Sequence, residues 1–199
     1  MKAKFITLLL LTVNISGCQT VLTAALGMKE SQPQSDASVL AYASAKYPGY
    51  SIFRVDSTRM GTMLKEAYKP NWDVGFRPIQ FICFAPSGKV IAQWASCEGD
   101  LKGALASFPP RSKYAGDSTK TFRYFAQGTK PLRSTSSALS LNNNQYTYLI
   151  YWTTWTNKQS INLVNSITEY VKRNGGKQSN ILLVNIDEHP YYSVRNAMK

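Results

Sequence analysis

The sequence predicts an α/β fold in which helices flank a mixed β-sheet. Three stretches carry this prediction. Residues 146–186 have the pattern of a strand, a helix and a strand, residues 77–108 that of two strands joined by a tight turn and followed by a helix, and residues 37–68 that of a strand between two helices. The chain of 199 residues is long enough for one good-sized domain, which we expect over residues 38–199.

The N-terminus has the pattern of a secretory leader. Lys2 and Lys4 precede an apolar block, residues 5–13, that is too short for a comfortable membrane span. We expect residues 1–17 to be a signal peptide that is removed, and residues 18–37 to be a polar tether. The leader holds two lysines and no acid, so its removal lowers the formal charge from +12 to +10. Such an excess favours anionic neighbours such as headgroups, peptidoglycan or acidic protein surfaces, with simply solvated lysines as the alternative.

The end of the leader, Ile15-Ser16-Gly17-Cys18, resembles the lipobox of bacterial lipoproteins. In that family the cysteine is lipidated and then acylated on its new amino group, so the resemblance implies that Cys18 is the lipidation site. Each buried methylene contributes roughly 0.8 kcal/mol, so several acyl chains anchor a protein stably. Because Gln19 follows, the resemblance also implies transport to the outer membrane, where we expect the periplasmic face rather than the cell surface. An ordinary leader with a fortuitous cysteine is the alternative.

Three elements are predicted before residue 69. Asp36 is expected to cap a helix over 37–47. Residues 50–56 alternate as a strand, and residues 58–68 place apolar side chains at helical spacing: Met60, Met63, Leu64 and Ala67. We interpret the methionines as core filling rather than as a cofactor site.

A β-hairpin is predicted over residues 77–95. A strand over 77–85 is followed by the turn Pro86-Ser87-Gly88-Lys89 and a strand over 90–95, with a helix over about 100–108 behind them. If this turn closes the hairpin, Cys83 lies opposite residues near Ala92 and Cys97 lies well past its end. That spacing argues against a disulfide between the two cysteines.

Residues 109–144 are predicted to be a basic connector with one edge strand, at 121–126. The segment contains a single acid, Asp117, and aromatic residues lie among its basic residues. The basic residues are Arg111, Lys113, Lys120, Arg123, Lys130 and Arg133. Basic and aromatic residues together can bind single-stranded nucleic acid, but no recognisable nucleic-acid module surrounds these. We therefore expect a solvated connector and no nucleic-acid ligand.

The last part of the chain predicts a βαβ unit. Residues 146–152 form a strongly apolar strand, a helix over about 158–174 has one apolar side and stops at Gly175-Gly176, and residues 181–186 form a buried strand. Such a unit is right-handed and its strands are parallel.

The hairpin and the βαβ unit resemble the two halves of thioredoxin-like domains. Pro78 stands where that family keeps a cis proline beside its active site, residues 151–155 resemble the aromatic strand end before the active site, and residues 184–187 resemble the third strand. The halves occur in reverse order along this chain. The resemblance therefore implies either one permuted sheet or two incomplete units that share a core.

The chain departs from the redox members of that family at the active site. In place of Cys-x-x-Cys it has Thr156-Asn157-Lys158-Gln159, and neither threonine nor glutamine can supply the thiolate that disulfide exchange requires. His189 is the only histidine, and the sequence has no Gly-x-Ser-x-Gly elbow, zinc-ligand cluster or phosphate-binding loop. We therefore expect no catalytic residue, no metal and no cofactor, and hence no enzyme.

These observations predict an outer-membrane lipoprotein whose thioredoxin-like domain binds other envelope proteins, as a subunit of a secretion or conjugation assembly. Its partner-binding residues are expected at a groove that accepts an extended peptide: Arg77, Pro78, Trp155, Thr156 and Gln159. The alternative is a periplasmic thiol-redox protein that works through Cys83 or Cys97. The sequence leaves the partner and the oligomeric state open.

Overall fold

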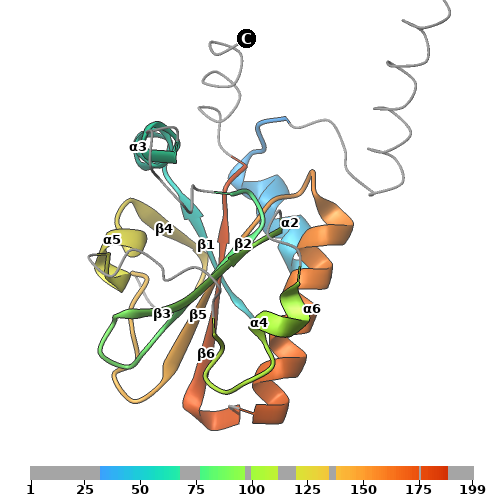
Figure 1. The fold of residues 1–199 in the computed structure, drawn as a ribbon. Helices are drawn as coiled ribbons and strands as arrows, with labels where there is room; N and C mark the ends of the chain where they lie inside the picture. The colour runs from blue at the N-terminus through green and yellow to red at the C-terminus, as the bar shows by residue number, and fades with distance from the viewer. Residues whose placement is uncertain are drawn as a thin grey trace, which may run out of the picture.

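The structure is a computed structural model that describes residues 32–67, 77–96, 100–111, 120–134, 138–174 and 176–187. The predictions for the leader, Cys18, Cys97 and His189 lie outside these residues. The predicted α/β fold is confirmed: helices flank one mixed six-stranded sheet with the strand order β3-β2-β5-β6-β1-β4 (Figure 1). Its strands are β1 (Ser51–Val55), β2 (Gln80–Phe84), β3 (Val90–Ala95), β4 (Thr129–Arg133), β5 (Tyr146–Trp152) and β6 (Ser179–Asn185).

The centre of the sheet is the predicted βαβ unit. β5 and β6 run parallel, with Leu149 opposite Leu182, and α6 (Asn157–Asn174) connects them. Both strands are largely buried because helices cover the two faces of the sheet, which explains their continuous apolar sequences. β1 adds a third parallel strand beside β6, and β4 closes that side as an antiparallel edge, where Pro131 is tolerated.

The hairpin joins the other side of the same sheet. β2 and β3 are antiparallel with Cys83 opposite Ala92, as the turn predicted, and β2 pairs with β5 in antiparallel register. The hairpin and the βαβ unit therefore share one sheet, although the hairpin comes first in the chain. Cys83 is a free thiol.

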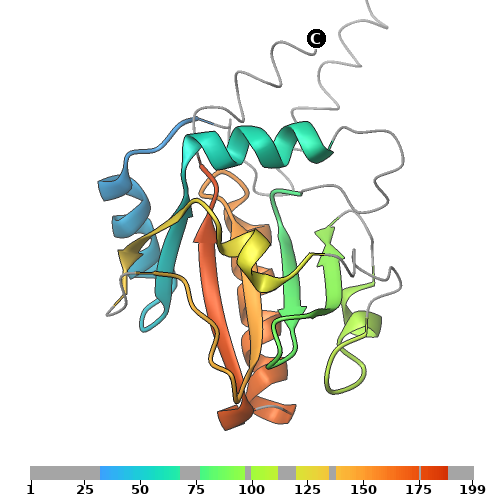
Figure 2. The ribbon, with the colours of Figure 1, turned by 90° about the vertical axis from the view of Figure 1, so that its left-hand side faces the viewer.

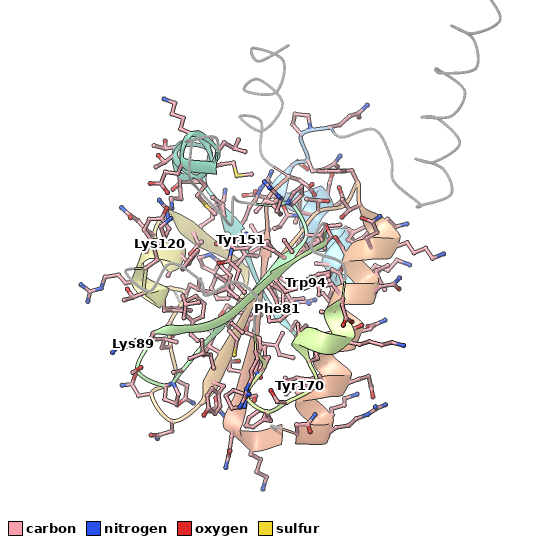
Figure 3. The ribbon with its side chains drawn as sticks, viewed as in Figure 1. Phe81, Lys89, Trp94, Lys120, Tyr151 and Tyr170 are labelled. Carbon is pink, nitrogen blue, oxygen red and sulfur yellow. The ribbon has the colours of Figure 1, made fainter. Side chains whose placement is uncertain are left out.

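Two hydrophobic cores hold the layers together, one on each face of the sheet. α2 (Asp36–Lys46), α4 (Leu101–Ala104) and α6 cover one face, while α3 (Ser57–Ala67) and α5 (Phe122–Ala126) cover the other (Figure 2). On the α6 side, Phe81 and Trp94 from paired strands stack with ring centroids 6.3 Å apart, and Tyr170 of α6 packs nearby against Tyr148 (Figure 3). On the other side, Met60, Met63 and Leu64 are buried, as their spacing predicted.

The prediction of an edge strand at 121–126 is wrong, because these residues form α5 and the edge strand is β4. Phe122 and Phe125 are three residues apart, so a helix directs both into the same core, where their rings lie 5.2 and 5.6 Å from that of Phe84. Gly128, with a φ of +68°, then turns the chain into β4.

Smaller differences concern helix ends and one proline. α2 begins at Asp36, inside the stretch expected as a tether, and Ser35 rather than Asp36 caps it by accepting from the Ser38 amide at 3.1 Å. α4 is shorter than the helix expected at 100–108. The peptide bond before Pro78 is trans, and among the described residues the cis bond is Phe108–Pro109, so the cis proline implied by the resemblance is a point of departure.

Candidate functional site

The candidate site lies at the edge of the sheet where β1, β5 and β6 end and β2 begins, called here the carboxyl edge. Gln80 of β2 is opposite Tyr151 of β5, so Arg77-Pro78 and the loop 153–156 leave the sheet on the same side. Ligands of open α/β sheets bind outside the carboxyl ends of the parallel strands. The topology thus brings the two segments that carry the sequence-predicted residues to one edge.

Three buried hydroxyl groups hold the loop together. The Oγ1 atoms of Thr153 and Thr156 are 2.7 Å apart, and Thr156 Oγ1 is 2.5 Å from the Oγ atom of Ser160. The Thr153 amide donates to Ser160 Oγ at 3.2 Å, and all three residues are at most 1 % exposed. Thr156 therefore orders the loop from within, because its side chain does not reach the surface.

The other predicted residues lie nearer to solvent. Arg77 is exposed, while Pro78, Trp155 and Gln159 are half-buried. Asn157, between Trp155 and Gln159, has a φ of +21°, a region that asparagine adopts more readily than most residues. Its Oδ1 atom accepts from the Tyr42 hydroxyl at 2.7 Å, which ties the start of α6 to α2.

Asp187, just beyond β6, forms a hydrogen bond with the same loop. It was not among the site residues predicted from the sequence. Its Oδ2 atom accepts from the Thr154 amide at 2.8 Å and from Asn185 Nδ2 at 2.9 Å. The residue is fully buried, and burial raises the pKa of its carboxyl group above the ordinary value. Its Oδ1 atom has no hydrogen-bond partner within the described part of the chain. The sequence signal for this role is that two polar residues, Asn185 and Asp187, stand at the end of an apolar strand.

Arg54 connects Asp187 to the N-terminal segment. Its Nη2 atom donates to the main-chain oxygens of Gln34 and Asp187, both at 2.6 Å, and its Nη1 atom donates to Asp36 Oδ1 at 2.5 Å. Asp36 Oδ2 accepts from Lys130 at 2.6 Å, and these two cations, Lys130 foremost, lower the pKa of the Asp36 carboxyl group. Arg54 is only 3 % exposed, so a buried cation holds the N-terminal segment at Gln34 and Asp36 against the carboxyl edge.

An aromatic cluster lies under the loop on the α2 side. Tyr42 stacks on Trp152 with ring centroids 5.7 Å apart, and Tyr47 meets the edge of Trp152 at 5.0 Å. Trp152 is fully buried directly before the loop, so the loop is built on a packed base rather than over an open space.

Cys83 lies away from this loop within the sheet. It is fully buried in the core on the α6 side, and burial raises the pKa of its thiol to about 12. At neutral pH almost none of it is thiolate, the form that attacks disulfides.

The described residues contain no group of three or more side chains suited to hold a metal ion. None of the helices in these segments combines the length and apolar character needed to cross a bilayer. No protein-family model, curated protein or solved structure matches the chain.

What the carboxyl edge offers chemically is a rigid surface loop with an aromatic side chain, an amide and an adjacent guanidinium group.

Proposed function

We propose that this chain is a lipid-anchored, non-catalytic thioredoxin-like domain that binds another protein of the bacterial envelope. Cys18 would hold it at the periplasmic face of the outer membrane, where it serves as a structural or assembly subunit of a secretion or conjugation machine. Its binding surface is the carboxyl edge, with Arg77, Pro78, Trp155 and Gln159 facing the partner. Thr156 contributes indirectly, by fixing the loop.

One observation carries this proposal. In the loop that follows β5 and at the start of α6, the hydroxyl groups of Thr153, Thr156 and Ser160 bond to one another and to the backbone rather than facing a substrate. A buried, internally satisfied network rigidifies a surface loop without giving it a nucleophile. A rigid loop with a partly exposed aromatic side chain and an arginine nearby is favourable for protein binding, because little conformational entropy is lost on association.

The thiol-redox alternative has less support. It requires Cys83 or Cys97 to form a thiolate, and burial of Cys83 opposes this strongly, with a thiol pKa of about 12. An insulin-reduction assay on the protein with Cys83→Ser and Cys97→Ser distinguishes the two functions. A reductase activity that is present in the parent protein and lost in this variant would favour the alternative.

Affinity purification from detergent-solubilised membranes tests the proposed function. We expect tagged protein to recover a specific envelope partner, and Arg77→Ala and Trp155→Ala each to reduce that recovery. Arg123→Ala is the matched control, because Arg123 is an exposed arginine on α5, away from the loop. Undiminished partner recovery with both site variants would contradict the assignment of the binding surface.

A further inference from the structure

The anchored end of the chain enters the domain at the carboxyl edge. Arg54 holds Gln34 there. Figures 1 and 2 show the start of α2, the end of β6 and α3 at this same end of the strands. Cys18 precedes Gln34 by 16 residues (34 minus 18), which even fully extended span at most roughly 55 Å. A lipid at Cys18 would therefore keep this edge within that distance of the bilayer, whereas the opposite edge can lie farther away by the length of the sheet.

Basic side chains are exposed at this edge. Lys65 lies in the last turn of α3, Lys158 in the first turn of α6, and Arg77 before β2, and all three are exposed. Neither lysine forms an ion pair with a carboxylate in the described part of the chain. Both charges therefore face solvent uncompensated.

Two described acids of the same edge are paired with cations inside the fold. Asp36 accepts from Arg54 and Lys130. Glu66 accepts from the Tyr124 hydroxyl and lies 3.9 Å from Lys120.

Two further acids of this edge lie in the part of the chain that the structure describes. Asp56 accepts from the Arg59 amide at 2.7 Å, and Asp187 is fully buried. Among the described residues of this edge, Asp36 and Glu66 are paired with cations and Asp187 is buried, whereas Lys65 and Lys158 are exposed and unpaired, so these two lysines present positive charge to solvent.

We propose that the carboxyl edge docks onto the surface of an anionic phospholipid bilayer through Lys65 and Lys158. Basic residues close to an anionic bilayer are attracted to it within about a Debye length. The inference relies on the anchor of the proposed function only to choose this edge over the opposite one. A protein partner bound at the loop 153–156 would then lie close to the membrane surface.

Co-sedimentation with vesicles tests this inference without the anchor. The mature protein with Cys18→Ser, which removes the lipidation site, is mixed with vesicles of pure phosphatidylglycerol or pure phosphatidylcholine. We expect binding to phosphatidylglycerol that weakens with added salt, and no binding to phosphatidylcholine. Adding Lys65→Glu and Lys158→Glu should lower partitioning at least about tenfold.

The matched control is Lys89→Glu with Lys177→Glu. Both lysines are exposed at the opposite end of the sheet, after β2 and before β6, so the change in net charge is identical. We expect it to retain most of the binding. Equal loss in both double variants, no loss in either, or failure of the parent protein to bind phosphatidylglycerol would overturn the inference. None of these outcomes bears on partner recovery, which uses Arg77 and Trp155 variants in native membranes.

Discussion

Arg54 and Asp187 meet at the carboxyl edge, where Arg54 Nη2 donates to the main-chain oxygen of Asp187 at 2.6 Å. The same guanidinium group binds Gln34 and Asp36, and the side chain of Asp187 binds the Thr154 amide. One buried cation thus links the entering chain, the end of β6 and, through Asp187, the loop of the candidate site.

Arg54→Met should destabilise the fold by about 2–4 kcal/mol, because the buried main-chain oxygen of Asp187 and the part-buried one of Gln34 lose a charged donor. The lost pair with Asp36 adds little to this figure, since the Asp36 side chain is 47 % exposed. Urea unfolding measures the change. Arg123→Met, which alters an exposed arginine, should shift the free energy of unfolding by no more than about 0.5 kcal/mol, and equal shifts in the two variants would refute the role of Arg54.

Asp187→Asn should change how stability depends on pH. Burial raises the pKa of the Asp187 carboxyl group above its ordinary value of 3.8, so the folded chain binds this proton more tightly than the unfolded chain. The contribution of Asp187 to stability is therefore full below pH 3.8 and is lost as pH rises through the raised pKa. Relative to the wild type, the variant should gain stability over that window.

Asp36→Asn provides the opposite sign for comparison. The pKa of Asp36 is lowered from 3.8, so its contribution is present above that value and is lost as pH falls through the lowered pKa. Urea unfolding of both variants across a pH series should give differences from wild type that run in opposite directions. Parallel differences would mean that the two carboxyl groups are not held as described.

Cys83 should resist alkylation in the folded protein. With Cys18→Ser and Cys97→Ser in place, it is the only thiol, and its burial and its pKa of about 12 both oppose reaction with iodoacetamide near pH 8. Mass spectrometry should detect modification only after urea is added. Native and unfolded protein reacting at similar rates would reopen a redox role for this residue.

Thr156→Cys with Gln159→Cys should form an internal disulfide under oxidising conditions. The Gln159 amide donates to the Thr156 carbonyl at 2.8 Å, so a single turn at the start of α6 joins the two residues, which have the spacing of a Cys-x-x-Cys pair. Thr156→Cys with Lys158→Cys is the control, because residues two apart do not face each other on a helix. Intact mass under non-reducing conditions reads the result, and a disulfide in the control but not in the test pair would contradict the proposed alignment of the loop.

The parts of the fold that could be predicted from sequence are those specified by neighbouring residues. The apolar runs of β5 and β6, the one-sided pattern of α6 and the turn that sets Cys83 opposite Ala92 all depend on short-range patterning. Residues 121–126 show the limit of such reasoning. Their alternation resembles a strand, but two phenylalanines three residues apart satisfy a helix equally well, and only the position of Phe84 beneath them decides between the two.

By itself, the sequence determined the α/β class, the order of most elements and the absence of a Cys-x-x-Cys pair after β5. Tertiary structure alone decided that the hairpin and the βαβ unit share one sheet, that Thr156 turns inward, and that Asp187 belongs to the site. The physical reason is separation along the chain: Arg54 and Asp187 are 133 residues apart, and a contact of that kind leaves no periodic trace near either residue. Burial then sets the pKa of Asp187 and the reactivity of Cys83, and burial exists only once the layers have packed.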